Sequence, residues 1–176
     1  WAYDVYNKVE LPLSFILSKM EQSGVLLDIN SLSNLDSELA EQIETIQSNI
    51  FTLAGKEFNV ASVKQLTEVL FDDLQLPIIS KTKSGKSSTS EEVLQKLVDH
   101  HPIIPQILEF RTLTKLKSTD TSRLIKESAN NNGKVHCFFN QTATVTGRLS
   151  SSEPNLQNIP VKGHYGPLIR QCFIAK

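Results

Sequence analysis

The chain has 176 residues, of which 39% are hydrophobic and 21% charged, with a formal net charge of -1. This composition fits one globular domain, or a compact domain with a partial second one. No apolar run reaches about 18 residues and no charged-then-apolar leader is present, so we expect neither a membrane span nor a secretory signal, and a cytoplasmic protein. Cys137 and Cys172 have no nearby cysteine partner, which predicts reduced, buried thiols.

The charge is divided unevenly along the sequence. Residues 1–80 hold 4 lysines and 12 acidic residues, whereas residues 81–126 carry a net charge of +4 and residues 127–176 a net charge of +3. An acidic body with a basic remainder suits a protein that meets a polyanion with one side only, although solvated faces are often lopsided too.

The first predicted helix covers residues 9–24 and ends at Gly24. Its apolar residues recur at three- and four-residue intervals, and Pro12 suits a first turn. Residues 25–27 form a brief extended step, after which Asp28 or Asn30 can cap a second helix. That second helix is marked by apolar residues with a period close to 3.5, namely Leu32, Leu35, Leu39, Ile43, Ile46, Ile50 and Leu53.

A long antiparallel partner for this helix is expected at residues 102–128, where an apolar stripe follows two prolines. Two short helices lie between the long ones in the sequence. One opens with the capping box Ser62–Gln65 and runs to Leu74, and the other opens with Ser88–Glu91 and runs to Val98.

The pattern changes after the turn-forming residues 129–133, because Val135, Cys137 and Phe139 then alternate with other side chains as in a strand. Residues 169–175 are a second strand candidate. The predicted fold class is therefore α+β and mostly α, with a domain boundary near residue 129 between the helices and the start of a sheet.

Residues 80–90 form a low-complexity basic loop that we expect to be a mobile tip. Gly85-Lys86-Ser87 matches the end of a P-loop, but Ser80 stands where its first glycine belongs, so phosphate wrapping by the backbone is disfavoured. The loop can still contact DNA phosphates, although a solvated linker is the alternative. The candidate contacts are Lys81, Lys83, Lys86, Ser87, Ser88 and Thr89.

A second basic stretch lies in the predicted helix 102–128. Arg111 and Lys115 fall four residues apart on one helical face, with Ser118 one turn further. Such a face can follow a phosphate strand, but by itself it is more often a solvated surface.

Residues 140–160 combine one guanidinium, Arg148, with several side-chain amides and hydroxyls and with two prolines that stiffen the backbone. These donors suit base edges and sugars. The run from Thr144 to Pro160 closely resembles the T-x-T-G-R-L-S-S-x-x-P-N-L-Q-N-I-P signature of family A DNA polymerases, the bacterial DNA polymerase I type. The resemblance extends nearly end to end, through Met20-Glu-x-x-Gly-Val and Lys115-Leu-Lys-Ser-Thr, with Asp120 where many members have tyrosine.

The resemblance implies roles for single residues. Arg148 would reach the primer-terminal pair in the minor groove and Gln157 a neighbouring position, because minor-groove acceptors occupy nearly constant places in all base pairs. His136 and Gln141 would adjoin the same groove. The DNA backbone and sugars would be held by Asn155, Asn158, Thr142 and Thr144, and by the thumb residues Arg111, Lys115, Lys117 and Ser118.

The resemblance also implies a domain plan and a parent protein. Residues 1–24 would be a connecting helix at the base of the polymerase domain, 25–128 the helical thumb with two long antiparallel helices and short tip helices, and 129–176 the first, incomplete part of the palm. The parent would be a monomeric DNA-directed DNA polymerase of replication and repair, acting on primer–template DNA and deoxynucleoside triphosphates. Its two Mg²⁺ ions would be held by aspartates that this sequence lacks, so we expect the chain to bind no metal and to be inactive alone.

Two other classes fit parts of the sequence. One is a non-catalytic nucleic-acid-binding helical module, and the other is a helix-pairing scaffold, which the 3.5-residue period of 32–53 favours. Phosphate contacts would make affinity fall steeply with salt, whereas apolar helix pairing would not.

Overall fold

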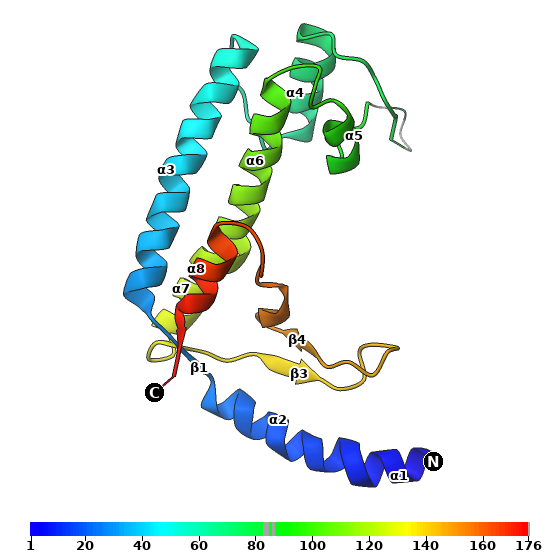
Figure 1. The fold of residues 1–176 in the computed structure, drawn as a ribbon, viewed down its shortest axis with the longest axis vertical. Coiled ribbons are helices and arrows are strands. Elements are labelled where there is room, and N and C mark those ends of the chain that lie inside the picture. The colour runs from blue at the N-terminus through cyan, green and yellow to red at the C-terminus, as the bar shows by residue number, and fades with distance from the viewer. Residues whose placement is uncertain (83–84, 86, 176) are drawn as a thin grey trace. The chain divides into compact units, whose positions relative to one another are not determined.

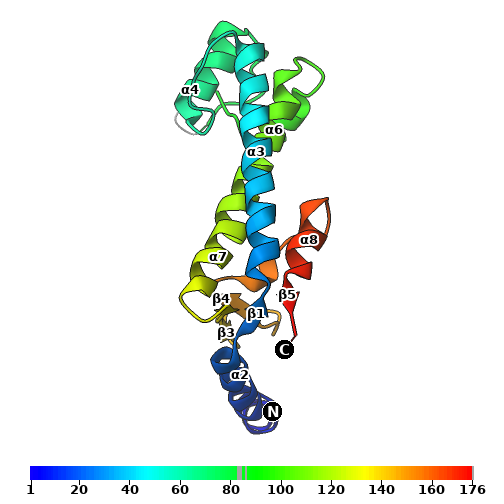
Figure 2. The same ribbon diagram turned by 90° about the vertical axis from the view of Figure 1, so that its left-hand side faces the viewer.

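The computed structural model describes residues 1–82, 85 and 87–175. It is mostly helical with small antiparallel sheets, as expected (Figures 1 and 2). The chain forms two compact units: unit 1 contains Trp1–Asp36 and Ser118–Lys176, and unit 2 contains Ser37–Lys117. None of the helices within the described residues is both long enough and apolar enough to cross a membrane.

The N-terminal helix of unit 1 begins earlier than the sequence indicated. It consists of α1 (Ala2–Val5), the π-helical turn η1 (Tyr6–Glu10) and α2 (Leu11–Ser23). Pro12 therefore lies within a continuous helical run. Proline lacks an N–H, and its ring clashes with the carbonyl four residues earlier. The π-helical turn η1, which is wider than an α-helical turn, lies just before Pro12 and accommodates the ring. Of the apolar residues predicted to face the core, only Leu17 is buried, while Ile16 and Met20 are exposed.

A three-stranded antiparallel sheet joins the two sequence segments that make up unit 1. The central strand is β1 (Val25–Leu27), which pairs with β2 (Lys134–Val135) on one side and β5 (Phe173–Ile174) on the other. The short extended step predicted at residues 25–27 is confirmed.

A second sheet in unit 1 consists of β3 (Phe138–Asn140) and β4 (Ser150–Ser152), paired antiparallel. The alternation predicted for residues 135–139 is thus divided between two strands. After it come the 3-10 helix η4 (Leu156–Asn158) and the helix α8 (Tyr165–Gln171). The prediction of a strand over 169–175 is wrong for its first four residues, because 169–171 belong to α8 and Cys172 is the C-cap of that helix. Tyr165, Ile169 and Cys172 are buried at spacings of four and three residues, which is a helical pattern.

The longest helix is α3 (Ile29–Ala54), whose first turns belong to unit 1 and the rest to unit 2. Asp28 caps it as predicted. Its carboxylate accepts from the Ser31 N–H at 3.0 Å and from the Ser31 hydroxyl at 2.7 Å, and these bonds lower the pKa of Asp28. Leu32, Leu39 and Ile50 are fully buried, which confirms the predicted apolar stripe.

The expected long helix over residues 102–128 has three parts. These are α6 (Ile103–Leu116), the π-helical turn η3 (Lys117–Thr121) and α7 (Ser122–Ala129). In unit 2, α6 runs antiparallel to α3 (Figure 1), and the Asn49 amide donates to Gln106 Oε1 at 3.5 Å. The apolar side of α6 is buried and includes Ile103, Ile104, Ile107, Phe110, Leu113 and Leu116.

Three short helical segments complete unit 2: α4 (Val63–Thr67), η2 (Glu68–Asp73) and α5 (Glu91–Lys96). Ser62 caps α4 as predicted, by accepting from the Gln65 N–H at 3.5 Å, but the reciprocal half of the capping box is absent, because Gln65 Oε1 accepts from the Asn59 N–H instead. The second capping box is wrong, because α5 begins after Ser90. The Ser88 hydroxyl instead accepts from the Ser90 N–H at 3.3 Å, in the turn before the helix.

Candidate nucleic-acid interface

Arg148 lies in the loop that connects β3 to β4, and its side chain is exposed. The loop is closed locally. The Thr144 hydroxyl donates to the Arg148 carbonyl at 2.6 Å, and the Gly147 N–H donates to the Thr144 carbonyl at 3.5 Å. Gly147 has φ of +73°, a conformation that glycine adopts without strain. Because the Thr144 hydroxyl holds the backbone, the guanidinium is presented to solvent from a fixed turn.

Asn155 organises the segment that carries Gln157. Its Oδ1 accepts from the Gln157 N–H at 3.1 Å and from the Ser151 hydroxyl at 3.0 Å, so it caps η4 and ties that helix to β4. The Gln157 side-chain amide donates to the Leu149 carbonyl at 3.1 Å. Gln157 and Arg148 are therefore connected through the residue that follows Arg148. Thr142 and Asn158 are exposed in the same region.

The strand β3 is attached to the N-terminal helix of unit 1. Glu21 Oε1 accepts from the Phe139 N–H at 2.7 Å, and the Gln141 amide donates to the carbonyl and carboxylate of Glu10 at 3.0 and 2.7 Å. His136 Nδ1 contacts the Glu21 carbonyl at 2.7 Å. The sequence indicated His136 and Gln141 beside the Arg148 loop, but it gave no sign of either glutamate, because their partners lie more than 110 residues away.

Arg111 and Thr89, two predicted phosphate contacts, bind each other in unit 2. The guanidinium donates to the Thr89 carbonyl at 2.6 Å and to the Thr89 hydroxyl at 3.4 Å. Thr89 is only 6% exposed. Burial lowers the pKa of Arg111, and the charge of Glu91 opposes that effect. The pair thus fastens the segment before α5 to α6.

The remaining predicted residues of the basic stretch lie where α6 passes into η3. Lys115 and Ser118 are exposed and Lys117 is half-buried. Ser118 is the first residue of the second segment of unit 1, whereas the two lysines belong to unit 2.

The basic loop folds back on itself at its base. Lys81 and Ser87 form an antiparallel bridge, and the Ser88 N–H donates to the Ser80 carbonyl at 3.0 Å. Lys81 is exposed, Ser87 and Ser88 are half-buried, and the predicted contacts Lys83 and Lys86 lie outside the described residues. A P-loop runs directly into a helix after its Ser or Thr, whereas here α5 begins four residues after Ser87.

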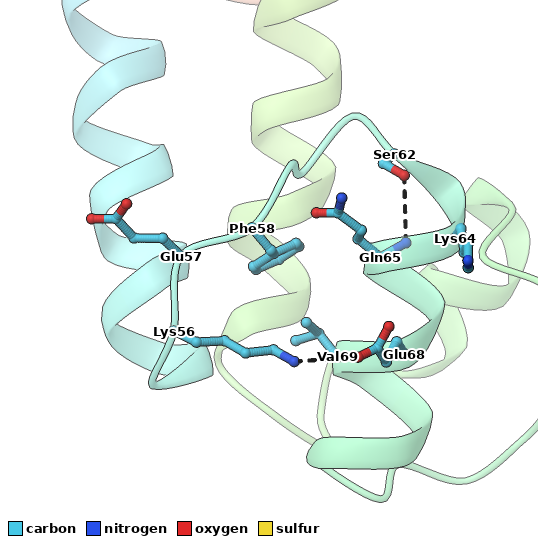
Figure 3. Close-up of a pocket in the computed structure, with 8 residues that line it drawn as sticks. All are labelled: Lys56, Glu57, Phe58, Ser62, Lys64, Gln65, Glu68 and Val69. Carbon is cyan, nitrogen blue, oxygen red and sulfur yellow. Dashed lines mark hydrogen bonds and ion pairs between the residues drawn. The ribbon is translucent and has the colours of Figure 1, made fainter.

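A pocket of about 380 Å³ lies between the end of α3 and the α4–η2 segment (Figure 3). Its charged lining residues are Lys56, Lys64, Glu57 and Glu68, so the formal charges cancel. Phe58 and Val69 provide its apolar part. A lining of balanced charge gives the pocket no particular preference for anions.

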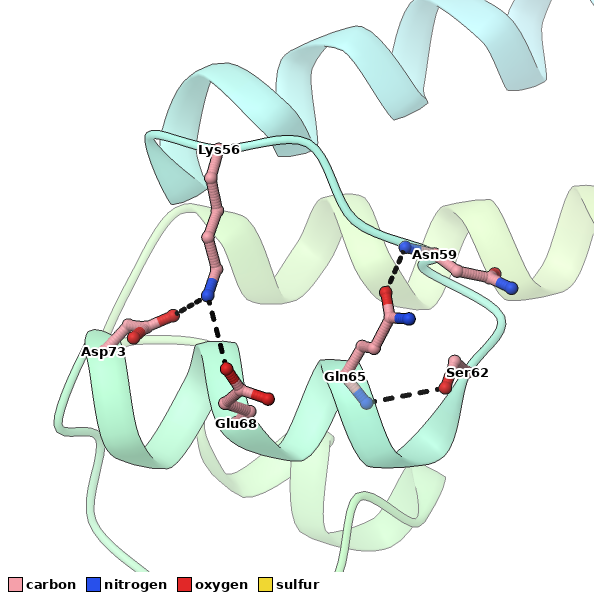
Figure 4. A network of polar contacts seen from close by, with 6 residues as sticks. All are labelled: Lys56, Asn59, Ser62, Gln65, Glu68 and Asp73. Carbon is pink, nitrogen blue, oxygen red and sulfur yellow. Dashed lines mark hydrogen bonds and ion pairs between the residues drawn. The ribbon is translucent and has the colours of Figure 1, made fainter.

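Lys56 is engaged in a network at the edge of that pocket (Figure 4). Its ammonium lies 2.6 Å from Asp73 and 3.6 Å from Glu68, and the hydrogen bond to Asp73 is the main cause that raises the pKa of Lys56. In the same network, Gln65 Oε1 accepts from the Asn59 N–H at 2.7 Å. These contacts fasten the end of α3 to η2.

Within residues 1–82, 85 and 87–175, no three His, Cys, Asp or Glu side chains gather in a group that could hold a metal ion.

Comparison with known proteins places these features in a family. The profile of DNA polymerase family A matches residues 29–176. The chain therefore belongs to family A of the DNA polymerases.

Individual relatives and a solved structure agree with this assignment. The chain is 52% identical over 173 residues to the thermostable DNA polymerase I of Thermus aquaticus, and 51% identical over 168 residues to DNA polymerase I of Geobacillus stearothermophilus. These two matches cover 98% and 96% of this chain, but only 21% and 19% of the relatives, or about a fifth of their length. A solved structure of the POL domain of Pol1 from M. smegmatis, in complex with DNA primer-template and dNTP, superimposes with a TM-score of 0.88 at 40% identity. That match covers 98% of this chain and 30% of the other.

Proposed function

We propose that this chain is the part of a DNA-directed DNA polymerase that grips primer–template DNA during replication and repair in the bacterial cytoplasm. Residues 25–128 would act as the thumb and residues 129–176 as the beginning of the palm. The observation that carries the proposal is the exposed guanidinium of Arg148 on a locally closed turn, within a family A polymerase chain. The M. smegmatis relative was solved with primer-template DNA and dNTP, which supports the choice of partner.

The Arg148 loop would read the shape of the last base pair. Purine N3 and pyrimidine O2 are acceptors at nearly the same minor-groove positions in every pair, so a donor there accepts any correct pair and senses a distorted one. Arg148 offers several N–H donors from one planar group. A glutamine amide carries two N–H bonds, so Gln157 can hold the Leu149 carbonyl with one and offer the other to DNA.

The other predicted contacts would bind the DNA backbone and sugars, which fixes register without reading sequence. Near the loop these are Thr142, Thr144, Asn155 and Asn158, and in the thumb they are Arg111, Lys115, Lys117, Ser118, Lys81, Lys83, Lys86, Ser87, Ser88 and Thr89. In this set, the Arg111–Thr89 pair would act through the fold of unit 2, because its guanidinium is directed to Thr89. The nucleotide and its metal ions would be bound by parts of the polymerase outside this chain.

The test compares two variants of the complete polymerase. Arg148→Ala should slow extension of a matched primer end, and of a mismatched one, by about 10-fold while leaving duplex affinity nearly unchanged, because it removes a minor-groove donor and leaves the phosphate contacts in place. The triple change Lys81→Ala, Lys83→Ala and Lys86→Ala should weaken binding to every sequence. It should also reduce the salt slope by roughly 0.9 for each phosphate that the protein no longer neutralises.

The matched control is Lys8→Ala, which removes an exposed lysine paired with Asp4 in the acidic N-terminal part of the chain. It should leave both readouts near those of the parent protein. Equal effects of Arg148→Ala and the triple change would contradict the division of labour, and salt-independent binding would favour a helix-pairing scaffold instead.

A further inference from the structure

The strand that leads into the Arg148 loop is held at two points by carboxylates of the N-terminal helix. We propose that Glu21 and Glu10 are positioning residues, which set the place of Arg148 by fixing β3. The inference rests on the proposed function of Arg148. Neither glutamate would contact DNA; each would act through the strand.

Glu21 satisfies a backbone group at the edge of a two-stranded sheet. Phe139 is the middle residue of β3, opposite Ser151 of β4, and its N–H donates to Glu21 Oε1 at 2.7 Å. An edge N–H otherwise bonds water or remains available for another strand. A carboxylate accepts a stronger hydrogen bond than a neutral acceptor does. Glu21 therefore fixes the position at which β3 lies along the axis of α2.

Glu10 holds the residue at which the loop begins. Gln141 directly follows β3, and its amide reaches both the carbonyl and the carboxylate of Glu10, at 3.0 and 2.7 Å. The pair Asn140 and Ser150 closes the hairpin beside it, and Arg148 is only two residues before Ser150. A movement of β3 would therefore move β4 and, with it, the backbone that carries the guanidinium.

Two further contacts secure the same attachment at the C-terminal end of α2. The Lys134 ammonium donates to the Ser23 carbonyl at 2.7 Å, and His136 contacts the Glu21 carbonyl at 2.7 Å. Donors at a helix C-terminus satisfy carbonyls that have no partner within the helix. Four residues of the segment 134–141 are thus attached to η1 and α2, namely Lys134, His136, Phe139 and Gln141.

The experiment uses the complete polymerase and a charge exchange. Gln141→Glu places a carboxylate against Glu10, and like charges at this distance should displace the loop and slow extension of a matched primer by up to about 10-fold, the loss expected when Arg148 itself is removed. The double variant Gln141→Glu with Glu10→Gln restores a donor–acceptor pair and should recover most of the rate. Glu21→Ala should slow extension in the same way, whereas Glu21→Gln keeps an acceptor oxygen and should retain most of the rate.

A double-mutant cycle with Arg148→Ala distinguishes glutamates that position Arg148 from glutamates that only stabilise the fold. If the glutamates act through Arg148, Gln141→Glu should slow extension little further once Arg148 is removed. Additive effects, or no recovery by the Glu10→Gln exchange, would overturn the inference.

Hydrogen exchange in the protein without DNA tests the attachment independently of the proposed function. The Phe139 amide should exchange faster in Glu21→Ala than in Glu21→Gln, and equal rates would overturn the inference. An unchanged extension rate in Arg148→Ala alone would instead remove the proposed function.

Discussion

The imidazole ring of His136 lies directly over Gly24. A β-carbon placed on Gly24 would come within 2.7 Å of His136 Cε1. The ring is held there by its Nδ1, which lies 2.7 Å from the Glu21 carbonyl. A carbonyl can only accept, so Nδ1 carries the proton in this contact. The residue after α2 must therefore be glycine for the segment between β2 and β3 to pack this closely against it.

Gly24→Ala should destabilise the chain by about 1–3 kcal/mol from backbone strain alone, because Gly24 has φ of +62° and ψ of 177°, a region that is essentially restricted to glycine. The contact with His136 adds to this loss. Urea unfolding measures the change. A control is Gly55→Ala, also at positive φ (+71°) but with no atom within 4 Å of the added carbon, which reports the effect of an alanine at positive φ without a clash.

The clash itself is tested by combining Gly24→Ala with His136→Ala. The double variant should be more stable than the sum of the two single losses predicts, because the ring that meets the new methyl group is gone. Additive losses would show that His136 and the added carbon do not meet.

Asn155→Ala should destabilise unit 1 by about 1 kcal/mol, since the substitution removes the side-chain cap of η4. It also removes the partner of the Ser151 hydroxyl. Thermal unfolding measures this loss. Asn155→Asp keeps the accepting oxygen and should unfold at nearly the same temperature as the parent protein. Equal destabilisation by both variants would show that hydrogen bonding to Oδ1 does not stabilise η4.

The sequence indicated helices well where an apolar period and a cap agree. The 3.5-residue spacing of Leu32 to Leu53 and the Asp28 cap predicted α3 nearly to the residue. Both signals are local, since they depend on neighbours within one or two turns. The π-helical turns η1 and η3 have no such local signal. The sequence alone therefore puts Pro12 in the first turn of a helix and predicts one uninterrupted helix over residues 102–128.

The sequence predicted that α3 has an antiparallel helical partner, but not the strand pairs or the single polar contacts between distant parts of the chain. Strand β4 is the tripeptide Ser150–Ser152, which has little strand propensity and forms because it pairs with β3. The sequence predicts the donors Arg148 and Gln157 because guanidinium and amide groups are conspicuous in a loop and because the run resembles the family A signature. Glu10 and Glu21 look like ordinary surface acids of a helix, and only the fold brings them to Gln141 and Phe139.

The Cys137 thiol should react slowly with a disulfide reagent in the folded chain. Burial is the main cause that raises the pKa of Cys137, and the negative charge of Glu21 raises it further, so less thiolate is present at a given pH. Glu21→Gln removes the smaller cause, and the curve of reaction rate against pH should move to lower pH. The measurement is made with Cys172→Ser, so that only one thiol reacts. A curve that moves to higher pH would contradict the assigned charge effect.

Asp36 should stabilise the chain where the π-helical turn η3 meets α7. Its Oδ1 accepts hydrogen bonds from the hydroxyl of Thr121, which is fully buried, and from the hydroxyl of Ser122 at 2.7 Å. Asp36→Ala removes both bonds while keeping the buried hydroxyl, and should destabilise unit 1 by about 1–3 kcal/mol. Thr121→Val removes the buried donor itself at nearly the same volume, and should cost less. Urea unfolding of both variants gives the comparison, and a larger loss for Thr121→Val than for Asp36→Ala would show that the hydroxyl depends on other partners.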